Sequence, residues 1–394
     1  MSDAARRVLE RADDLARFTE EPGRITRPLG SRSLAAAMAR VRDWMEAAGL
    51  RTRSDALGNL AGRRGAPPTV MIGSHLDSVA DAGRYDGILG VLVGLAVAEA
   101  LDDVPLELVA FADEEGLRFQ STFLGSRAFI GRLRPEELEL RDADGVTLRE
   151  AIDGPLDEPL FEGARAYFEV HIEQGPALDA AGLPLGVVTA IAGQTRFNLA
   201  FEGHAGHAGT TPMDLRRDAL AAAAEFVLAA ERLARETPGL MATVGEIGVP
   251  HGACNVIPGR VDATLDIRHQ DDDVRVRAIG TLQQQTAAIC ERRAIAATWS
   301  VIAEHEATPC SPELVARLAQ AVAETGVEVR EMPSGAGHDA ITMAEVTDIA
   351  MLFVRNAGGI SHHPDESVDL EDVALAIEAA TRFVGSLARE EVSA

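Results

Sequence analysis

Short apolar runs alternate with stretches whose apolar residues recur at helical spacing, and this pattern predicts an α/β fold. An apolar run at residues 69–73 is followed by a helical pattern over 88–101 and by a second apolar run at 106–112. Two more runs, 166–172 and 349–354, have the length and composition of buried strands. Because strands that alternate with helices favour parallel pairing, we expect one mostly parallel central sheet.

The region between the last two of these runs has a different pattern. It contains predicted strands at 195–201, 241–247, 260–268 and 296–303, and predicted helices at 214–235 and 273–292. The order strand, helix, strand, strand, helix, strand is typical of a ferredoxin-like βαββαβ sandwich. A chain of 394 residues also exceeds what one core usually fills. We therefore predict a domain at 194–308, inserted into a larger, discontinuous domain formed by 1–193 and 309–394.

Composition narrows the range of partners. The formal net charge is −25 and every basic residue is an arginine, so the surface should repel nucleic acid and anionic membranes. No segment has the ~18 uncharged apolar residues of a membrane span, and the N-terminal pattern is an amphipathic helix without the apolar core of a signal peptide. We expect a cytoplasmic protein without nucleic-acid or membrane partners. The cysteines Cys254, Cys290 and Cys310 lack CxxC spacing and are expected to be buried free thiols.

Imidazole and carboxylate side chains follow four of the predicted strands. Ligands of open α/β sheets bind beyond the carboxyl ends of the strands, so these side chains should gather at one edge. They are His75 and Asp77 after the first run, Asp113, Glu114 and Glu115 after the second, His171, Glu173 and Gln174 after the third, and His362 after the last. Asp86 lies in the glycine-flanked turn GRYDG that precedes the first helix.

This set of donors predicts a metal site. Imidazole and carboxylate without thiolate suit Zn, Mn, Co or Ni better than Ca or Mg. Five ligands are too many for one open catalytic zinc, so two ions that share one carboxylate is the simplest interpretation. Taken singly, each residue also has an ordinary interpretation, because a turn aspartate often caps a helix and a lone histidine is often structural. The grouping at four strand ends favours the metal site.

Over nearly its whole length the chain resembles the M20-type metallopeptidase superfamily, and within it the hydantoinase/carbamoylase branch. The motifs that carry the resemblance occur in order and are GSHLDSV, GRYDG, FADEEGLRF, HIEQGP, GHAGTTPMDLRRDA, NVIPGRVDATLDIR, SGAGHDA and GGISHHPDE. The resemblance implies that the inserted domain is a lid that also forms the interface of a homodimer.

The resemblance also implies roles for individual residues. Two divalent ions per subunit would be bound by His75, Asp86, Glu115, His171 and His362, with Asp86 as the bridging ligand, His75 and His171 on one ion, and Glu115 and His362 on the other. Glu114 would be the general base, because a carboxylate beside a water activated by two cations can take its proton. Asp77 would not bind metal itself but would fix the tautomer of the His75 imidazole by a hydrogen bond. The alternative is that Asp77 only caps the end of the strand.

Further residues match substrate contacts of the family. In the predicted lid, His207, Asn255 and Arg268 correspond to residues that bind the substrate carboxylate and carbonyl oxygen, and His207 would act in catalysis from across the dimer. Gln174 is a candidate substrate contact or a structural amide, and His204 is expected to be structural. Gly358 and Gly359 would leave room for the substrate beside His362, or form a simple turn. For His338 and Asp339, support of the ligands and plain packing are equally compatible with the sequence.

These observations predict an enzyme that hydrolyses the ureido (N-carbamoyl) group of a small carboxylate and releases ammonia and carbon dioxide. His171 favours this branch, because the peptidase and aminoacylase relatives usually have a carboxylate at the corresponding position. Allantoate and N-carbamoyl-L-amino acids are the favoured substrates, followed by N-carbamoyl-β-alanine and ureidoglycolate. Two competing hypotheses are an aminoacylase or dipeptidase on the same scaffold, and a non-catalytic binding protein that retains the metal site.

Overall fold

The computed structural model describes residues 2–152, 154–155 and 159–389. The chain forms two compact units: unit 1 is Met1–Thr189 with Cys310–Ala394, and unit 2 is Ala190–Pro309. The sequence placed the inserted domain at 194–308. Within the described residues no helix is long and apolar enough to cross a membrane.

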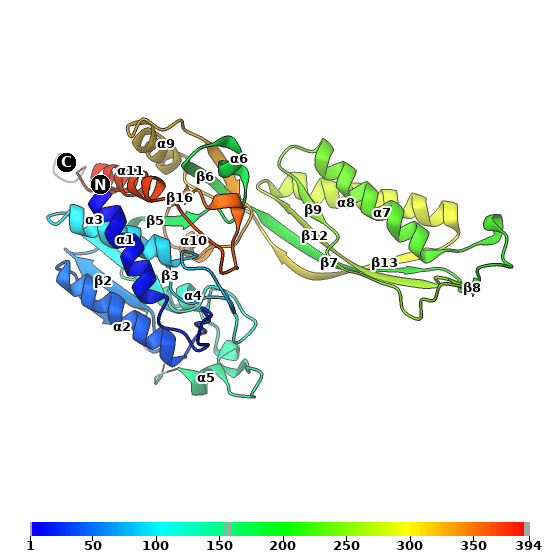
Figure 1. Cartoon of the computed structure of the whole chain (residues 1–394), viewed down its shortest axis with the longest axis horizontal. Coiled ribbons are helices and arrows are strands. Elements are labelled where there is room, and N and C mark those ends of the chain that lie inside the picture. The colour runs from blue at the N-terminus through cyan, green and yellow to red at the C-terminus, as the bar shows by residue number, and fades with distance from the viewer. Residues whose placement is uncertain (1, 153, 156–158, 390–394) are drawn as a thin grey trace. The chain divides into compact units, whose positions relative to one another are not determined.

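Unit 1 is built on a central sheet (Figure 1). Its strands lie in the order β1 (Arg51–Ser54), β2 (Leu60–Arg64), β4 (Leu106–Phe111), β3 (Thr69–His75), β5 (Ala164–Ile172), β16 (Ile349–Val354) and β6 (Leu185–Ile191), with β15 (Glu331–Ser334) beside β6. β14 (Thr308–Pro309) pairs with the last residues of β6, where the chain returns from unit 2. The four strands β4, β3, β5 and β16 are parallel, whereas the flanking pairs are antiparallel. The predicted α/β class with a parallel core is therefore confirmed.

Both faces of the central parallel strands are covered, because the helices that connect parallel strands pack on the sheet. Every residue of β3, β4 and β16 is buried, as expected for continuous apolar runs in an α/β sheet. The long helices of this unit are α1 (Ser2–Leu15), α2 (Arg32–Ala47), α3 (Ile88–Ala100), α9 (Pro312–Ala323) and α11 (Leu370–Arg389). α3 is apolar on all sides and its residues 88–98 are all buried, so it is the central helix of the unit. α11 packs against α1, α3 and α9.

Short elements complete unit 1 and carry most of its loops. They are α4 (Leu124–Phe129), a 3-10 helix at Pro135–Glu139, α5 (Leu148–Ala151), α6 (Ala177–Ala181), α10 (Ala340–Met343) and a 3-10 turn at Ala357–Gly359. Since β3, β4, β5 and β16 run in the same direction, the residues that follow them lie at one edge of the sheet. The register places His75 opposite Phe111, and His171 opposite Phe353.

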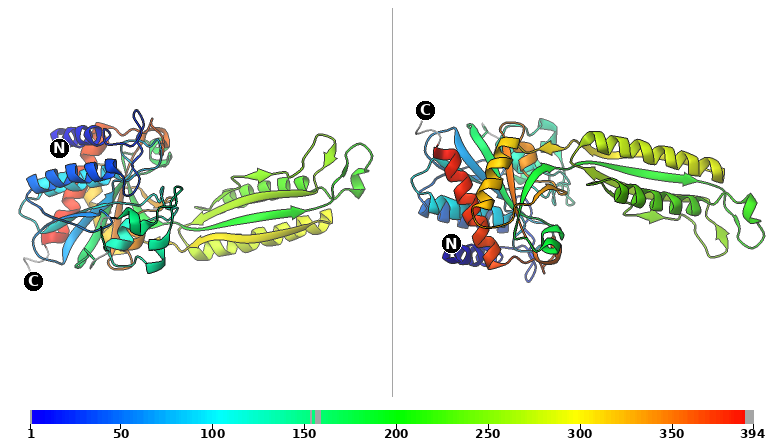
Figure 2. Two further views of the ribbon diagram at one scale, coloured as in Figure 1. Left: turned by 90° about the horizontal axis from the view of Figure 1, so that it is seen from below. Right: turned by 90° about the horizontal axis from the view of Figure 1, so that it is seen from above.

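Unit 2 is a ferredoxin-like sandwich. Its elements are β7 (Gly193–Glu202), β8 (Gly206–His207), a 3-10 turn at Met213–Leu215, α7 (Ala219–Glu236), β9 (Met241–Thr243), β10 (Ile247–Gly248), β11 (Val256–Ile257), β12 (Arg260–His269), α8 (Asp272–Arg293) and β13 (Ala296–His305). The sheet has the order β10-β12-β7-β13, with β9 also on β12. Both helices lie on one face of this sheet (Figure 2). Buried and accessible residues alternate along β7 and β12, which is why only one face of the sheet is covered.

Three expectations about details of the chain were wrong. The helix predicted at 214–235 begins only at Ala219, because the Asp218 side chain caps it by accepting the backbone N–H groups of Leu220 and Ala221. The strand predicted at 241–247 is two short strands, β9 and β10. Cys290 and Cys310 are buried free thiols as expected, but Cys254 is exposed.

Candidate metal centre

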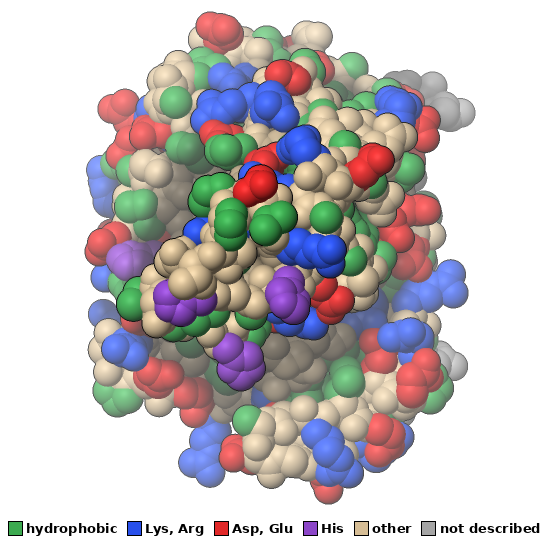
Figure 3. Space-filling view, turned by 90° about the vertical axis from the view of Figure 1, so that its right-hand side faces the viewer, with side chains coloured by type: hydrophobic (Ala, Val, Ile, Leu, Met, Phe, Trp, Pro, Cys, Tyr) green, Lys and Arg blue, Asp and Glu red, His purple; other side chains and the backbone are tan. Residues whose placement is uncertain are grey.

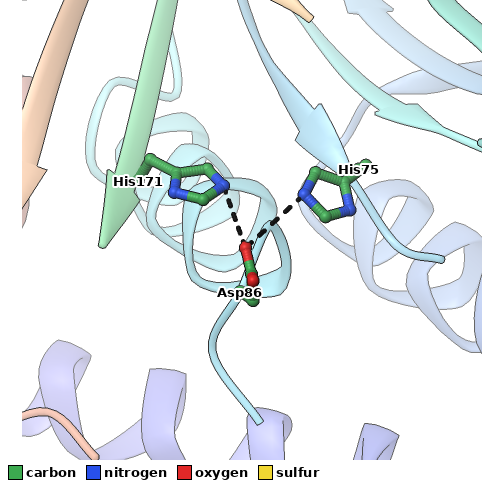
Figure 4. A group of neighbouring side chains, drawn as sticks. All are labelled: His75, Asp86 and His171. Carbon is green, nitrogen blue, oxygen red and sulfur yellow. Dashed lines mark ion pairs between the residues drawn. The ribbon is translucent and has the colours of Figure 1, made fainter. Parts of the chain in front are cut away.

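Three residues from separate parts of unit 1 meet at the carboxyl edge of the sheet (Figure 4). His75 is the last residue of β3, His171 lies near the end of β5, and Asp86 lies in the turn before α3. Nε2 of His171 is 3.3 Å and Nε2 of His75 is 3.8 Å from Oδ1 of Asp86. The turn needs Gly87 beside Asp86, because Gly87 has φ +69° and a Cβ there would lie 2.4 Å from Nε2 of His75.

The other carboxylate oxygen of Asp86 faces a second group. Nε2 of His362 lies 3.2 Å from Oδ2 of Asp86 and 3.6 Å from Oε1 of Glu115. Within each of the trios His75, Asp86, His171 and Asp86, Glu115, His362, one donor atom per residue lies within 4.8 Å of the others. His75, Glu114 and Glu115 form a further group of this kind. Asp86 thus lies between two possible metal positions, with Glu114 beside them.

The chemistry of the donors fits a cation. Nδ1 of His171 lies 3.0 Å from the carbonyl oxygen of Ile172, which can only accept, so this nitrogen carries the proton. Nε2 then points its lone pair at the Asp86 carboxylate, and two acceptors at 3.3 Å repel each other unless a positive charge lies between them. Burial lowers the pKa of His171 to about 4, which keeps the imidazole neutral near pH 7.

The surroundings of this cluster favour positive charge. Burial opposes protonation of His75, but its hydrogen bond with Asp77 and the nearby carboxylates raise its pKa well above the usual value. The hydrogen bond with Asp86 raises the pKa of His362 to about 9. Burial raises the pKa of Glu114 well above its usual range and that of Glu115 to about 7. Such shifts in a group of buried acids and imidazoles are typical of functional sites and of sites for cations.

Asp77 connects the ends of two strands. Its Oδ1 accepts the backbone N–H of Glu114 at 3.0 Å, and its Oδ2 accepts that of Glu115 at 3.1 Å. Nδ1 of His75 lies 3.2 Å from the Asp77 carbonyl oxygen and 3.4 Å from its carboxylate. Asp77 therefore contacts the His75 imidazole and in addition holds the backbone of Glu114 and Glu115.

Gln174 donates a hydrogen bond to the Asp86 carboxylate. It has φ +58°, an uncommon backbone conformation for a residue with a side chain. Its Nε2 donates to Oδ2 of Asp86 at 2.9 Å, and Ser361 Oγ donates to the same oxygen at 3.1 Å. Among the described residues, Oε1 of Gln174 is buried without a hydrogen-bond partner. Gln174 therefore belongs to the cluster, and its carbonyl oxygen is a buried acceptor that no described residue satisfies.

A fourth group of possible ligands, Glu169, His171 and His338, has a different character. Glu169 already accepts hydrogen bonds from Ser74 Oγ at 3.2 Å, Tyr167 OH at 3.1 Å and the Ala340 backbone at 3.0 Å. Nε2 of His338 lies 2.7 Å from Ser334 Oγ. The His338 ring packs edge-on against the ring of His171, with centroids 4.5 Å apart. These contacts make the group a support for the His171 ring rather than a third metal position.

The glycines before His362 have positive φ values, +64° for Gly358 and +68° for Gly359. The space beside Gly359 is occupied by protein, because a Cβ there would lie 2.5 Å from the backbone of Gly175 and Pro176. The space beside Gly358 has only ordinary contacts with Ile360. Gly359 therefore permits close packing of the two turns that carry His362 and Gln174.

The candidate residues of unit 2 lie in two places. His207 is paired with Val256 across β8 and β11, and the Ala208 N–H donates to the Asn255 carbonyl at 2.9 Å. This end of the unit adjoins the start of β12. Its exposed histidines are His204, His207 and His251. Figure 3 shows a face of the molecule on which histidine side chains gather. Arg268 lies at the other end of β12, about 26 Å along the strand, where it donates to Asp266 at 2.8 and 2.9 Å. Within one chain, His207 and Asn255 therefore lie at the opposite end of β12 from Arg268.

Three polar side chains that hydrogen-bond to Asp86 or Gln174 were missed in the sequence: Ser361, described above, Asn356 and Glu366. Oδ1 of Asn356 accepts the Gln174 N–H at 3.1 Å, and its Nδ2 donates to the Ile360 carbonyl at 2.7 Å. Glu366 accepts the backbone N–H groups of Tyr85 and Asp86. Glu366 lies in the motif GGISHHPDE, so proximity to His362 was the only signal available.

Comparison with known proteins agrees with this geometry. Residues 71–386 match the Peptidase family M20/M25/M40. The chain is 39% identical to a probable allantoate deiminase of Oryza sativa subsp. japonica, covering 98% of this chain and 89% of that protein. It is also 39% identical to an N-carbamoyl-L-amino acid amidohydrolase of Geobacillus stearothermophilus, covering 98% and 99%.

A solved structure extends the likeness to three dimensions. A hydantoinase/carbamoylase family amidase from Burkholderia multivorans superimposes with a TM-score of 0.91 at 34% identity, over 98% of both chains. Both the sequence and the fold are thus shared over nearly the full length. The chain belongs to the peptidase family M20/M25/M40, and its relatives include amidases of the hydantoinase/carbamoylase type.

Proposed function

We propose that this protein is a metal-dependent amidohydrolase with two divalent ions per subunit, which cleaves the ureido group of a small carboxylate. The observation that carries the proposal is the position of Asp86 between the trios His75, Asp86, His171 and Asp86, Glu115, His362. Buried Glu114, whose backbone N–H donates to Asp77, forms a further group of neighbouring donors with His75 of one trio and Glu115 of the other. Zn, Mn, Co or Ni would suit these donors.

In this proposal the ligands of each trio hold one ion. Two divalent cations in such a site polarise a carbonyl group and lower the pKa of water. Glu114 takes a proton from the attacking water as the oxygen adds to the ureido carbonyl carbon, and returns it to the leaving nitrogen when a carbon–nitrogen bond breaks. Burial raises the pKa of Glu114 well above its usual range, which makes its carboxylate a stronger proton acceptor. Cleavage of the bond to the substituted nitrogen gives the amino product and carbamate, and decomposition of the carbamate gives ammonia and carbon dioxide.

Residues of unit 2 bind the rest of the substrate in this proposal. The guanidinium of Arg268 can hold a carboxylate by two parallel hydrogen bonds, and His207 and Asn255 can donate to the carbonyl oxygen. Because His207 and Arg268 lie at opposite ends of β12, a complete site needs His207 and Asn255 of a second subunit. A homodimer formed through unit 2 supplies them. β13 is an edge strand with exposed Val301 and Ile302, which supports this surface as the interface.

The substrate class is inferred from His171 and from the relatives. A neutral imidazole at this position distinguishes the carbamoylase branch from the peptidases, and burial keeps His171 neutral. The relatives named for allantoate and for N-carbamoyl-L-amino acids are equally similar to the chain at 39% identity. We therefore propose one of these two substrates, ahead of N-carbamoyl-β-alanine, ureidoglycolate, and the acetyl or dipeptide substrates of aminoacylases and dipeptidases.

Ammonia release tests the proposal. The protein, reconstituted separately with Mn, Co, Ni and Zn, is assayed against allantoate, ureidoglycolate, N-carbamoyl-β-alanine, several N-carbamoyl-L-amino acids, N-acetyl amino acids and dipeptides. Ammonia from a single ureido acid is expected and identifies the substrate. Release of amino acids from acetyl or peptide compounds without ammonia would contradict the proposed reaction. A matched Glu114→Gln protein controls for contaminating hydrolases.

A further inference from the structure

Glu366 is a buried carboxylate that the proposed reaction does not use. It is 4% exposed and lies four residues after His362. Its Oε1 accepts the backbone N–H of Tyr85 at 2.7 Å and that of Asp86 at 3.1 Å. One oxygen thus binds the backbone of the turn that carries Asp86, which is 280 residues away in the sequence.

The turn is shaped to receive this carboxylate. A Cβ added at Gly83 would lie 2.4 Å from the Cβ, Cδ and Oε1 atoms of Glu366, so the turn closes on the side chain only because residue 83 is glycine. On the other side of Asp86, a Cβ added at Gly87 would lie 2.4 Å from Nε2 of His75, so the turn also packs closely against this ring. Asp86 is therefore held between the contacts of Glu366 and those of His75.

The backbone around Glu366 is itself fixed to the segment that carries His362. The Glu366 N–H donates to the His363 carbonyl at 3.1 Å, and the Ala357 N–H donates to the Ser367 carbonyl at 3.1 Å. His362 has φ +55° within this segment. Residues 357–367 therefore form a closed turn, and a shift of Glu366 relative to His362 would break these hydrogen bonds.

The remaining atoms of Glu366 argue against an ordinary ion pair. Within the described part of the chain no arginine or histidine lies within 4.0 Å of its carboxylate as an ion-pair partner, and Oε2 is buried without a hydrogen bond. A buried carboxylate is costly unless it is hydrogen-bonded, and its two bonds are both to the Asp86 turn. Both hydrogen bonds of the Glu366 carboxylate are thus made to the turn that carries Asp86.

We propose that Glu366 is a positioning residue that sets the separation between Asp86 and His362, and thereby the geometry of the metal position that these two share with Glu115. The proposal rests on the proposed function in that these residues bind metal. Without the carboxylate, two N–H donors beside Asp86 lose their buried acceptor and the turn relaxes away from His362. Residues that orient metal ligands in this way typically change metal affinity or activity by about 10- to 100-fold when replaced.

Binding of Co²⁺ to the metal-free protein tests this role. Glu366→Leu removes the acceptor, Glu366→Asp keeps the charge but retracts the carboxylate, and Glu366→Gln keeps a carbonyl oxygen at the same reach. Calorimetric titration and the visible absorption spectrum of bound Co²⁺ report affinity, stoichiometry and coordination geometry. Asp365→Asn, on an exposed neighbour in the same turn, is the matched control.

The expected result is that Glu366→Leu and Glu366→Asp weaken one of the two Co²⁺ sites about tenfold or more and alter its spectrum, whereas Glu366→Gln retains most of the affinity and Asp365→Asn matches the wild type. Thermal unfolding of the metal-free variants measures stability separately. Wild-type Co²⁺ affinity and spectrum in both Glu366→Leu and Glu366→Asp, with only a lower Tm, would overturn the proposal. If Glu366→Leu does not fold, the comparison of Glu366→Asp with Glu366→Gln decides between the two outcomes. Since the readout is metal binding, an error in the substrate assignment leaves this result unaffected.

Discussion

The backbone N–H of Glu114 donates a hydrogen bond of 3.0 Å to Oδ1 of Asp77. The second oxygen of Asp77 accepts the N–H of Glu115 at 3.1 Å, and Nδ1 of His75 lies 3.4 Å from the carboxylate. β3 and β4 are parallel neighbours, so a side chain just after one strand reaches the backbone just after the other. One buried carboxylate therefore holds the proposed general base and two proposed ligands in register.

Replacing Asp77 by Asn should lower kcat more than it changes KM. An amide offers one acceptor oxygen, and its NH2 group would face a second N–H donor, so the backbone of Glu114 or Glu115 must move. We expect kcat or metal affinity to fall about 10- to 100-fold. Steady-state kinetics and metal titration measure the two effects, with Asp102→Asn on an exposed loop as the control. Unchanged kcat and metal content would show that the two hydrogen bonds do not matter for catalysis.

Glu114→Gln should abolish turnover while metal still binds. Glu114 lies outside the two trios that share Asp86, so its loss removes the proton acceptor but neither set of ligands. A loss of roughly 100-fold or more in kcat is expected for a general base. Glu115→Gln is the contrasting variant, because it should lose metal as well as activity. A near-normal rate in the Glu114 variant, measured by ammonia release, would exclude the proposed mechanism.

Much of the site could be predicted because it lies at strand ends. Continuous apolar runs identified β3, β4, β5 and β16, and parallel strands must present their following residues at one edge. The grouping of His75, His171, Asp86, Glu115 and His362 follows from that rule and from the resemblance. The antiparallel flanking strands were missed, because β1 is polar and short and its pairing with β2 has no periodic signal of its own.

The roles of Glu366 and Asn356 could not be predicted for a different reason. Each acts through backbone groups of a turn that is distant in sequence, and no pattern of side chains encodes such a contact. The sequence also did not reveal the distance between His207 and Arg268, because this distance depends on which end of β12 each residue adjoins. Sequence patterns identify which helices and strands form, whereas the packing of turns against each other becomes visible only in the three-dimensional structure.

Thiol labelling should distinguish the three cysteines. Burial raises the pKa of Cys310 to about 12 and also raises that of Cys290, whereas Cys254 is exposed. The thiolate is the reactive form, so at pH 8 an excess of a thiol reagent should modify Cys254 alone in the native protein and all three cysteines after unfolding. Mass spectrometry of the labelled protein counts the modified residues. A native Cys254→Ser protein should remain unlabelled, and equal labelling of all three native thiols would contradict the burial of Cys290 and Cys310.

Arg268→Lys should raise KM more than it lowers kcat. The planar guanidinium can bind a carboxylate through two parallel hydrogen bonds, whereas an ammonium group cannot reproduce that geometry. Arg268 already binds the Asp266 carboxylate through Nε and Nη2, which shows that its side chain adopts this kind of pairing. An increase in KM of about tenfold, equivalent to 1.4 kcal/mol, is expected. Arg260→Lys, at the other end of β12, is the matched control, and equal KM values for the two variants would argue against substrate binding by Arg268.

Mixing two inactive variants should restore activity if the site is shared between subunits. A His75→Ala subunit lacks a proposed metal ligand but keeps a functional His207, and a His207→Ala subunit has the reverse defect. In a heterodimer, the site of the His207→Ala subunit receives the intact His207 of its partner, whereas the other site lacks both groups. Random exchange of subunits therefore predicts about a quarter of the wild-type activity.

Gel filtration with light scattering establishes the dimer, and subunits are exchanged by mild denaturation and refolding of the mixture. Each variant refolded alone serves as the control and should stay inactive. A mixture that also stays inactive, although heterodimers are detected by mass spectrometry, would place His207 in the site of its own subunit, which the length of β12 between His207 and Arg268 argues against.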